Sequence, residues 1–268
     1  MNDAKNDVKN FWDEASCGEA LYLRDDTRES YEDQARARYE LEPWIISFAD
    51  FESSRDKKVL EIGVGLGSDH QRFAEAGADL HGIDLTERAI NHVKKRFFEN
   101  SLISQLNIGD AENLSFKDST FDIVYSYGVL HHTPNTTQAI KEVYRVLKPG
   151  GIARIMIYHK WSIVGFMLWI RYGLLAFRPF MGLAEIYDRY LESPGTKAYS
   201  VSEAKKLFCA FTDVEIDTFL SHADLLESGA GQRHGGIALR IARRIWPRKL
   251  IRMFLPKMGL PMLIVAKK

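Results

Sequence analysis

Two adjacent histidines, His131 and His132, stand out in this 268-residue chain as candidate catalytic or metal-binding residues. They follow an apolar run typical of a strand, in the stretch VYSYGVLHHTPN at 124–135. Imidazole can bind metal ions or exchange a proton with a substrate near neutral pH. No carboxylate or cysteine pattern close by in the sequence completes a metal ligand set, so we predict no metal site and favour proton exchange. The alternative is that the histidines only cap a helix that begins near Pro134.

A glycine cluster follows an earlier apolar run, in VLEIGVGLGSD at 59–69. Gly63, Gly65 and Gly67 would let the backbone turn tightly and approach a ligand closely. The helix expected after them would direct its amide groups and the positive end of its dipole toward that ligand. This pattern is typical of a nucleotide-like cofactor, although a plain turn between a strand and a helix would look similar.

An acidic residue, Asp84, ends the next apolar run at 79–84. A carboxylate at the end of that strand can accept hydrogen bonds from both hydroxyls of a ribose. An acid in this position often caps a helix instead, but Thr86 is available for that role. The glycine cluster and Asp84 together therefore indicate a cofactor that contains a ribose.

Two classes of cofactor use this arrangement. Nicotinamide enzymes usually carry G-x-G-x-x-G, whereas here Ser68 stands where the third glycine would fall. Glu61, just before the turn, is unfavourable for a pyrophosphate and suits a cofactor with an ammonium group. S-adenosylmethionine has an ammonium group and no phosphates, so we favour it. An NAD(P)-dependent oxidoreductase is the alternative, and a non-catalytic cofactor-binding subunit is a third possibility.

Strand and helix patterns alternate along the chain. Strand-like runs lie at 58–63, 79–84, 105–110, 121–126, 151–158, 211–219 and 261–267, and helical patterns separate most of them. This alternation predicts an α/β fold with a mostly parallel sheet covered by helices on both faces. Ligands bind at the carboxyl ends of the strands in such sheets, so the glycine cluster, Asp84 and the histidines should meet at one edge.

Four motifs, VLEIGVGLGSD, LHGIDLT, GDAENLSF and FDIVYSYGVLHHTPNTTQAIKEVYRVLKPGGIARIMIY, resemble those of class I S-adenosylmethionine-dependent methyltransferases. The resemblance is strongest to the small-molecule (UbiE-like) branch and runs from about Lys57 to Tyr158. It implies a Rossmann-like, doubly wound sheet of seven strands with an antiparallel last strand. It also implies S-adenosylmethionine as the cofactor and methyl transfer to a small-molecule or amphipathic acceptor.

The resemblance implies roles for individual residues. Glu61 and the three glycines would form the loop at the methionine side, and Asp84 would hold the ribose. Near the adenine we expect Leu85, Asp110, Ala111 and Glu112, with capping of its own loop as the alternative for Asp110. Beside the methionine moiety and the methyl we expect Ser126 and Tyr127. His132 matches a histidine at the acceptor site of related enzymes, so we favour it over His131 as the base.

The rest of the chain is predicted to close the site. Residues 1–52 would form an N-terminal helical cap segment, from which Tyr22, Tyr31 or Tyr39 could reach the reacting groups. Residues 53–268 would form the methyltransferase domain, with lid insertions at about 159–200 and 221–258. Cys17 is interpreted as a pocket thiol or, preferably, as a small buried hydrophobe.

The two insertions differ in composition. The first carries aromatic residues that we expect to cap the pocket, with an exposed face for a lipid or partner as the alternative: Trp161, Phe166, Trp169, Tyr172, Phe177 and Phe180. The second belongs to a segment, 231–268, that contains no Asp or Glu and many Arg and Lys. It is interpreted as a solvated basic helical pair, with peripheral membrane contact as a hypothesis.

Charge and cysteine content limit the partners and the compartment. Thirty-six basic residues balance 36 acidic ones, so no nucleic-acid partner is expected. The N-terminus lacks the apolar core of a signal peptide, and the two cysteines do not suggest a disulfide framework. No apolar run is long enough to span a bilayer. We therefore expect a cytoplasmic protein.

Overall fold

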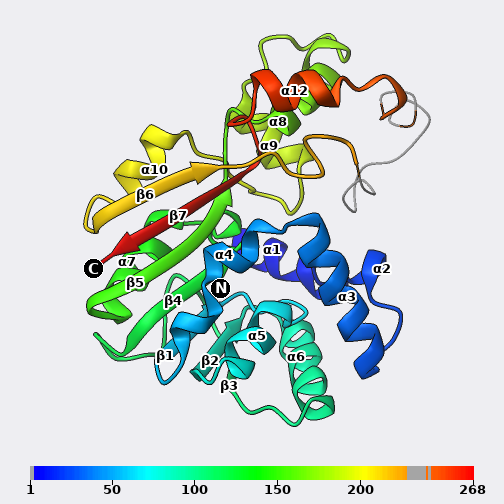
Figure 1. Ribbon diagram of the computed structural model, residues 1–268. Helices are drawn as coiled ribbons and strands as arrows, with labels where there is room; N and C mark the ends of the chain where they lie inside the picture. The colour runs from blue at the N-terminus through cyan, green and yellow to red at the C-terminus, as the bar shows by residue number, and fades with distance from the viewer. Residues whose placement is uncertain (1–2, 228–239, 241–242) are drawn as a thin grey trace.

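A seven-stranded sheet forms the centre of the computed structural model, which describes residues 3–227, 240 and 243–268 (Figure 1). The strand order is β3-β2-β1-β4-β5-β7-β6. The strands are β1 (Lys58–Ile62), β2 (Asp79–Asp84), β3 (Gln105–Ile108), β4 (Phe121–Tyr127), β5 (Leu147–Tyr158), β6 (Thr212–Thr218) and β7 (Pro261–Lys267). Only β7 runs antiparallel to its neighbours, β5 and β6. The predicted α/β fold, its seven strands and its antiparallel last strand are therefore confirmed.

The central strands are mostly apolar because helices cover both faces of the sheet. Val59 of β1 packs in one hydrophobic cluster and its neighbour Leu60 in another, as the alternation of side chains along a strand requires. Val59 shares its cluster with α4 (Trp44–Ala49), α5 (Ser68–Glu75) and α6 (Glu87–Glu99). Leu60 shares the other with α7 (Thr136–Val146) and α10 (Val201–Leu207).

The start of α7 settles the alternative reading of the paired histidines. Asn135 caps this helix, since its side chain accepts a hydrogen bond from the backbone N–H of Gln138. His131 and His132 lie earlier, in the short 3₁₀ helix η2 (Leu130–His132), and both are buried. The idea that they cap the helix near Pro134 is therefore wrong.

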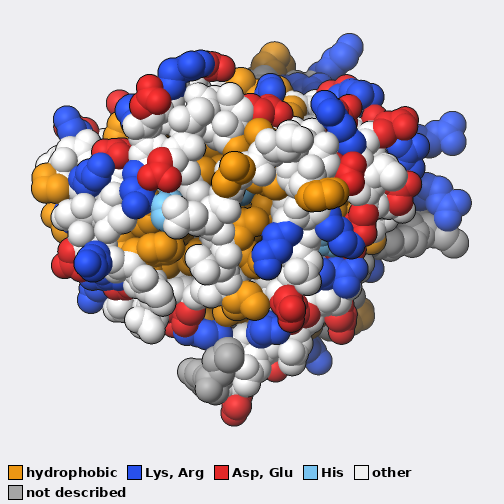
Figure 2. Space-filling view, turned by 90° about the horizontal axis from the view of Figure 1, so that it is seen from below, with side chains coloured by type: hydrophobic (Ala, Val, Ile, Leu, Met, Phe, Trp, Pro, Cys, Tyr) orange, Lys and Arg blue, Asp and Glu red, His pale blue; other side chains and the backbone are white. Residues whose placement is uncertain are grey.

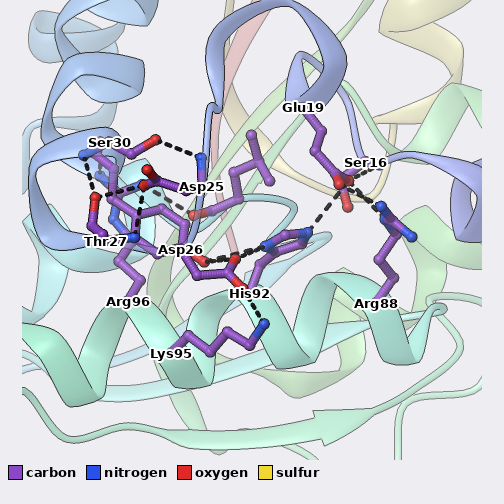
Figure 3. A network of polar contacts seen from close by, with 12 residues as sticks. Ser16, Glu19, Asp25, Asp26, Thr27, Ser30, Arg88, His92, Lys95 and Arg96 are labelled. Carbon is purple, nitrogen blue, oxygen red and sulfur yellow. Dashed lines mark hydrogen bonds and ion pairs between the residues drawn. The ribbon is translucent and has the colours of Figure 1, made fainter.

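The N-terminal segment lies against α6 and beside the carboxyl edge of the sheet (Figure 1). It comprises α1 (Asp3–Glu14), α2 (Glu19–Tyr22), α3 (Arg28–Leu41), α4 and the 3₁₀ helix η1 (Phe51–Ser54). Figure 3 shows how polar contacts fix it: His92 of α6 lies between Glu19 (Nε2–Oε2 3.3 Å) and Asp26 (Nδ1–Oδ1 3.7 Å). Arg88 pairs with Glu19, and Lys95 pairs with Asp26.

The insertions form a lobe beyond the ends of β5 and β7 (Figure 1). The first contains α8 (Ile163–Trp169), the π-helix η3 (Ile170–Leu174) and α9 (Leu183–Tyr190). From the second, α12 (Arg248–Phe254) packs on α8, with Ile251 and Ile163 in one cluster. Arg233, at the start of the basic segment, lies outside the described residues.

Charged side chains are mixed on the surface. On the face drawn in Figure 2, Lys and Arg side chains alternate with Asp and Glu, with hydrophobic side chains between them. Among the described helices, none combines the length and apolar character that crossing a lipid bilayer requires. Both cysteines are free thiols.

Candidate active site

A cavity of about 380 Å³ opens at the carboxyl ends of β1, β2 and β4. Its volume lies in the range of small-molecule sites. The glycine loop, Asp84, Tyr127 and His132 line it from the sheet side. The N-terminal segment and the two insertions line it from the other sides, with Phe11, Trp12, Cys17, Tyr22, Leu191, Glu192, His222 and Leu260.

The three glycines of the loop have different reasons for being glycine. All have positive φ, at 82° for Gly63, 50° for Gly65 and 79° for Gly67. A Cβ on Gly63 would lie 2.1 Å from Val129 Cγ2, so that glycine is required for packing. A Cβ on Gly65 would meet nothing within 4 Å, because this residue faces the cavity. The loop therefore presents bare backbone to open space, which fits a nucleoside-containing cofactor.

Asp84 is held in place by its own loop. Its Oδ1 accepts hydrogen bonds from the backbone N–H and the hydroxyl of Thr86, at 2.9 and 2.8 Å. Its Oδ2 accepts one from Gly65 N–H at 3.3 Å. Burial raises the pKa of the Asp84 carboxyl, and these hydrogen bonds oppose the rise. The residue that caps α6 is Thr86 and not Asp84. Asp84 lines the cavity, where its carboxylate could bind a ribose.

Glu61 lines the cavity but is engaged differently from our expectation of a free carboxylate. Its Oε2 lies 2.8 Å from His70 Nδ1. His70 Nε2 faces the hydroxyl of Ser104, whose own hydrogen goes to Leu80 O, so the hydrogen-bond network assigns the imidazole proton to Nε2. Burial lowers the pKa of His70 to about 3, and burial together with the charge of Asp69 raises the pKa of Glu61 well above its usual value. The Glu61 carboxyl group is therefore hydrogen-bonded to His70 and is not free.

A further buried carboxyl group near the loop is that of Asp69, which the sequence did not single out. Burial disfavours its charge, but Arg38 and hydrogen bonds outweigh burial and lower its pKa. Arg38 contacts it at 2.7 Å, Tyr125 donates to it at 2.8 Å and Tyr39 at 3.0 Å. Two of these partners lie on α3, far from the loop in sequence, so no local pattern could reveal the cluster.

At the predicted adenine end, the cavity is lined by Leu85, Asp110 and Ala111. Glu112 does not line it, contrary to expectation, because its side chain binds Lys5 at 2.8 Å and the backbone N–H of Asn135 at 2.6 Å. Asp110 also pairs with Lys5, at 2.6 Å, and caps its loop by accepting from the Glu112 N–H. Lys5, which lines the cavity from α1, is a residue that sequence reasoning missed.

At the predicted methyl end, Tyr127 lines the cavity and Ser126 does not. The Tyr127 hydroxyl accepts a hydrogen bond from Trp44 Nε1 at 2.9 Å and donates to Glu42 at 3.1 Å. Ser126 is fully buried and donates to Ile62 O, which ties β4 to β1. Our placement of the Ser126 side chain beside the donor is therefore wrong, because this side chain forms a hydrogen bond between two strands of the sheet.

The N-terminal segment contributes one of the three candidate tyrosines. Tyr22 lines the cavity, whereas Tyr31 lies against His92 and Tyr39 against Asp69. Cys17 lines it too and is accessible from it, so the interpretation as a small buried hydrophobe is wrong. The surrounding protein raises the pKa of Cys17 to about 12, and the residue stays a thiol at neutral pH.

The two histidines occupy different positions. His132 lines the cavity, its Nδ1 lies 2.8 Å from Ser193 Oγ and 3.0 Å from Thr196 Oγ1, and its Nε2 lies 3.3 Å from Glu192 Oε2. His131 does not line the cavity and packs against Tyr158, with ring centroids 3.8 Å apart and the ring planes tilted by 38°. The sequence offers no carboxylate close to the histidines, but the loop after α9 brings Glu192 to them in space.

The expected aromatic cap is not formed. Among the described residues that line the cavity, none comes from the six aromatics of the first insertion. Tyr172 stacks on Tyr190 at 4.0 Å, and Phe177 and Phe180 are almost fully exposed, at 94% and 100%. The insertion contributes its end, Leu191 and Glu192, to the cavity instead.

The strand order and the position of the glycine loop and Asp84 at the cavity are those that the resemblance to class I S-adenosylmethionine-dependent methyltransferases implies. Comparison with known proteins agrees. Residues 60–155 match the family model described as a methyltransferase domain, which covers less than half of the chain.

Curated relatives resemble the chain over part of their length. Phosphoethanolamine N-methyltransferase 2 of Caenorhabditis elegans is 35% identical over 119 residues, 43% of this chain and 26% of the relative. Sterol 4-C-methyltransferase strm-1 of the same organism is 33% identical over 37% of this chain and 30% of the relative. Demethylmenaquinone methyltransferase of Geobacillus is 26% identical over 62% of this chain and 75% of the relative. The chain thus spans about a third or less of the first two.

A solved structure shares the fold over nearly the whole chain. The PH0226 protein of Pyrococcus horikoshii has a TM-score of 0.57 and 19% sequence identity, covering 92% of this chain and 94% of that one. At this identity the likeness shows the fold alone.

Proposed function

We propose that this protein transfers a methyl group from S-adenosylmethionine to a small or lipid-like acceptor by in-line displacement. One observation carries the proposal: a single cavity joins the glycine loop and Asp84 to Tyr127 and His132. When bound, the cofactor supplies a methyl group on a positively charged sulfur. The chain then has to hold the acceptor in line with that methyl and exclude water.

The residues divide these tasks. Gly65 and Asp84 would bind the nucleoside, and Leu85 and Ala111 would enclose its base. Tyr127, fixed by Trp44 and Glu42, would form the wall beside the methyl. His132 stays our predicted base, and Tyr22 and His131 stay candidates for supporting roles. Orientation of this kind supplies about 7–11 kcal/mol of barrier reduction in well-aligned reactions.

An apolar or amphipathic acceptor suits the lining of the cavity. Its acceptor end carries Trp12, Leu21, Met156 and Leu260 beside the few polar groups already described. The relatives named above include a sterol methyltransferase and a demethylmenaquinone methyltransferase.

The experiment is transfer of isotopically labelled methyl from S-adenosylmethionine into a metabolite and lipid extract, followed by mass spectrometry. We expect one labelled product class, lost in Asp84→Ala and kept in Asp79→Ala, which changes the exposed first residue of the same strand. Binding of the cofactor without labelling of any acceptor in the extract would contradict an enzymatic role.

We further propose that the outer surface of the lid contacts anionic membranes peripherally. Phe177, Phe180 and Met253 expose apolar side chains there. Basic residues accompany them: Arg178 follows Phe177 directly, and Lys249 lies one helical turn before Met253 in α12. Apolar and basic side chains together favour an anionic lipid surface. The cytoplasm stays our predicted compartment.

Co-sedimentation with phosphatidylserine vesicles at low salt tests this contact. Phe180→Ser should lower the bound fraction several-fold. Phe98→Ser, a matched change at an 82% exposed phenylalanine of α6 outside the lid, should leave it unchanged. Equal effects of the two changes would contradict a specific surface.

A further inference from the structure

Three side chains that can bind metal ions lie close together beside the acceptor end of the cavity. His131 and His132 come from η2, and Glu192 comes from the loop after α9. One ligating atom of each lies within 4.8 Å of the others. We propose that His131, His132 and Glu192 bind a divalent transition-metal ion at this end of the cavity.

The nitrogens of His131 are the first observation. This side chain is fully buried, and among the described residues neither Nδ1 nor Nε2 finds a hydrogen-bond partner. Buried polar atoms in folded proteins are nearly always satisfied, so an exception calls for an unobserved partner such as an ion or water. An imidazole whose two nitrogens both lack a protein partner has a lone pair available for a metal.

The proton on His132 is the second observation. Thr196 Oγ1 donates its hydrogen to Ser193 O at 2.6 Å, so it can only accept from His132 Nδ1. Ser193 Oγ lies 2.8 Å from the same Nδ1 and can accept from it as well, and a neutral imidazole with its proton on Nδ1 keeps a lone pair on Nε2. Metal-ligating histidines are fixed in this way, by donating the other ring N–H to an oxygen.

The gap between His132 and Glu192 is the third observation. The lone pair of Nε2 faces Glu192 Oε2 at 3.3 Å, and two electron-rich atoms at this separation need a positive charge between them. Ligands at about 2.0–2.1 Å from a tetrahedral zinc ion lie about 3.4 Å apart. Tyr158 donates to the same Oε2 at 2.7 Å and orients the carboxylate, as partners of ligating carboxylates do.

The ligand set indicates the class of ion. Two imidazoles and one carboxylate suit zinc, iron, cobalt or manganese in the divalent state and leave coordination positions open. His132 lines both the 380 Å³ cavity described above and a second cavity of about 490 Å³. An ion can therefore reach His132 from either cavity. The open positions would face the acceptor.

A consequence follows that rests on the proposed function. A cation here would lower the pKa of an acceptor hydroxyl or thiol. His132 would then act as a ligand and not as the base, and the proton would leave to water. The acceptor lone pair would form the new bond to the methyl carbon, and the carbon–sulfur bond of the cofactor would break with its electrons left on sulfur. The acceptor class would then be one with an ionisable oxygen or sulfur.

Metal binding can be measured without cofactor or acceptor. The full chain is stripped with a chelator, loaded with Zn²⁺, freed of excess ion and analysed for metal content, and its affinity is measured against a chromogenic chelator. We expect one ion per chain and at least a tenfold loss of affinity in His131→Ala, His132→Ala and Glu192→Gln. His222→Ala, which changes a cavity-lining histidine outside the cluster, should bind as the unmodified chain does.

Two outcomes would overturn the proposal. One is the absence of stoichiometric zinc in the folded, unmodified chain. The other is unchanged affinity in both His131→Ala and Glu192→Gln; the second variant guards against misfolding of the first, because Glu192 is partly exposed. A cofactor titration on the same metal-free sample keeps failure of the metal site distinct from failure of the proposed function.

Discussion

The donor end and the acceptor end of the cavity are built in different ways. The donor end comes from short motifs inside residues 60–155, each of which follows a strand of the sheet. The acceptor end is assembled from η2, α1, α2, the loop after α9 and residues 221–223, which lie far apart in the chain. Cofactor binding here depends on local backbone geometry, whereas acceptor binding depends on long-range packing.

The largest effect is expected at Arg96, which joins the N-terminal segment to the donor end. It is 1% exposed and donates to Leu66 O at 3.0 Å and Tyr31 O at 3.1 Å, and to two glutamine side chains. Burial lowers its pKa to about 10, so it is charged at neutral pH. Arg96→Met should lower the free energy of unfolding by about 3 kcal/mol or more, because several buried acceptors lose their donor.

Denaturant unfolding measures this loss. The adjacent Lys95→Met is the matched control, since Lys95 is exposed and its ion pair with Asp26 should contribute less than about 1 kcal/mol. If the two variants unfold alike, the two parts of the molecule are not joined through Arg96.

The next effect is on cofactor binding at Asp84. Asp84→Ala should weaken S-adenosylmethionine binding about 10- to 100-fold, because hydrogen bonds to a charged group contribute about 1.5–3 kcal/mol. Asp79→Ala, at the other end of β2, should bind as the unmodified chain does. Calorimetric titration gives both affinities, and an unchanged affinity in Asp84→Ala would show that our alignment of the donor end is wrong.

A third comparison separates backbone strain from contact with the cofactor. Gly65 and Gly150 both have positive φ and open space where a Cβ would lie, but only Gly65 lines the cavity. Alanine at either position should cost about 1–2 kcal/mol of stability. Only Gly65→Ala should also lower cofactor affinity, by about tenfold or more. Equal affinities in the two variants would place the cofactor away from the loop.

The smallest effect concerns the polar contacts of Figure 3. The hydrogen bonds from Arg88 outweigh burial and lower the pKa of Glu19 to about 2. A lowered carboxyl pKa stabilises the fold above the unfolded pKa of about 4.5, and this contribution disappears as the pH falls toward 2.

Glu19→Gln should therefore lower stability at pH 7 by about 1 kcal/mol or less, and the difference from the unmodified chain should shrink between about pH 4.5 and 2. Thermal unfolding across this range measures it, with Glu40→Gln on exposed α3 surface as the control. A difference that stays constant with pH would exclude an electrostatic origin.

The sequence was informative where a short pattern determines the geometry. Gly65 and Asp84 could be predicted to lie at the cavity because each follows or ends a buried strand at the carboxyl edge of the sheet. Apolar runs predicted the strands themselves. Ser126 was misplaced because alternation along β4 turns its side chain into the sheet. Glu192, Lys5 and Asp69 with its Arg38 partner could not be placed in the site, since their roles depend on contacts between segments distant in sequence.

Calorimetric titration of the unmodified chain with S-adenosylmethionine and, separately, with NAD⁺ tests the central claim most directly. The account predicts one molecule of S-adenosylmethionine bound per chain, weakened binding in Asp84→Ala, and no binding of NAD⁺. Binding of NAD⁺ without binding of S-adenosylmethionine would contradict it.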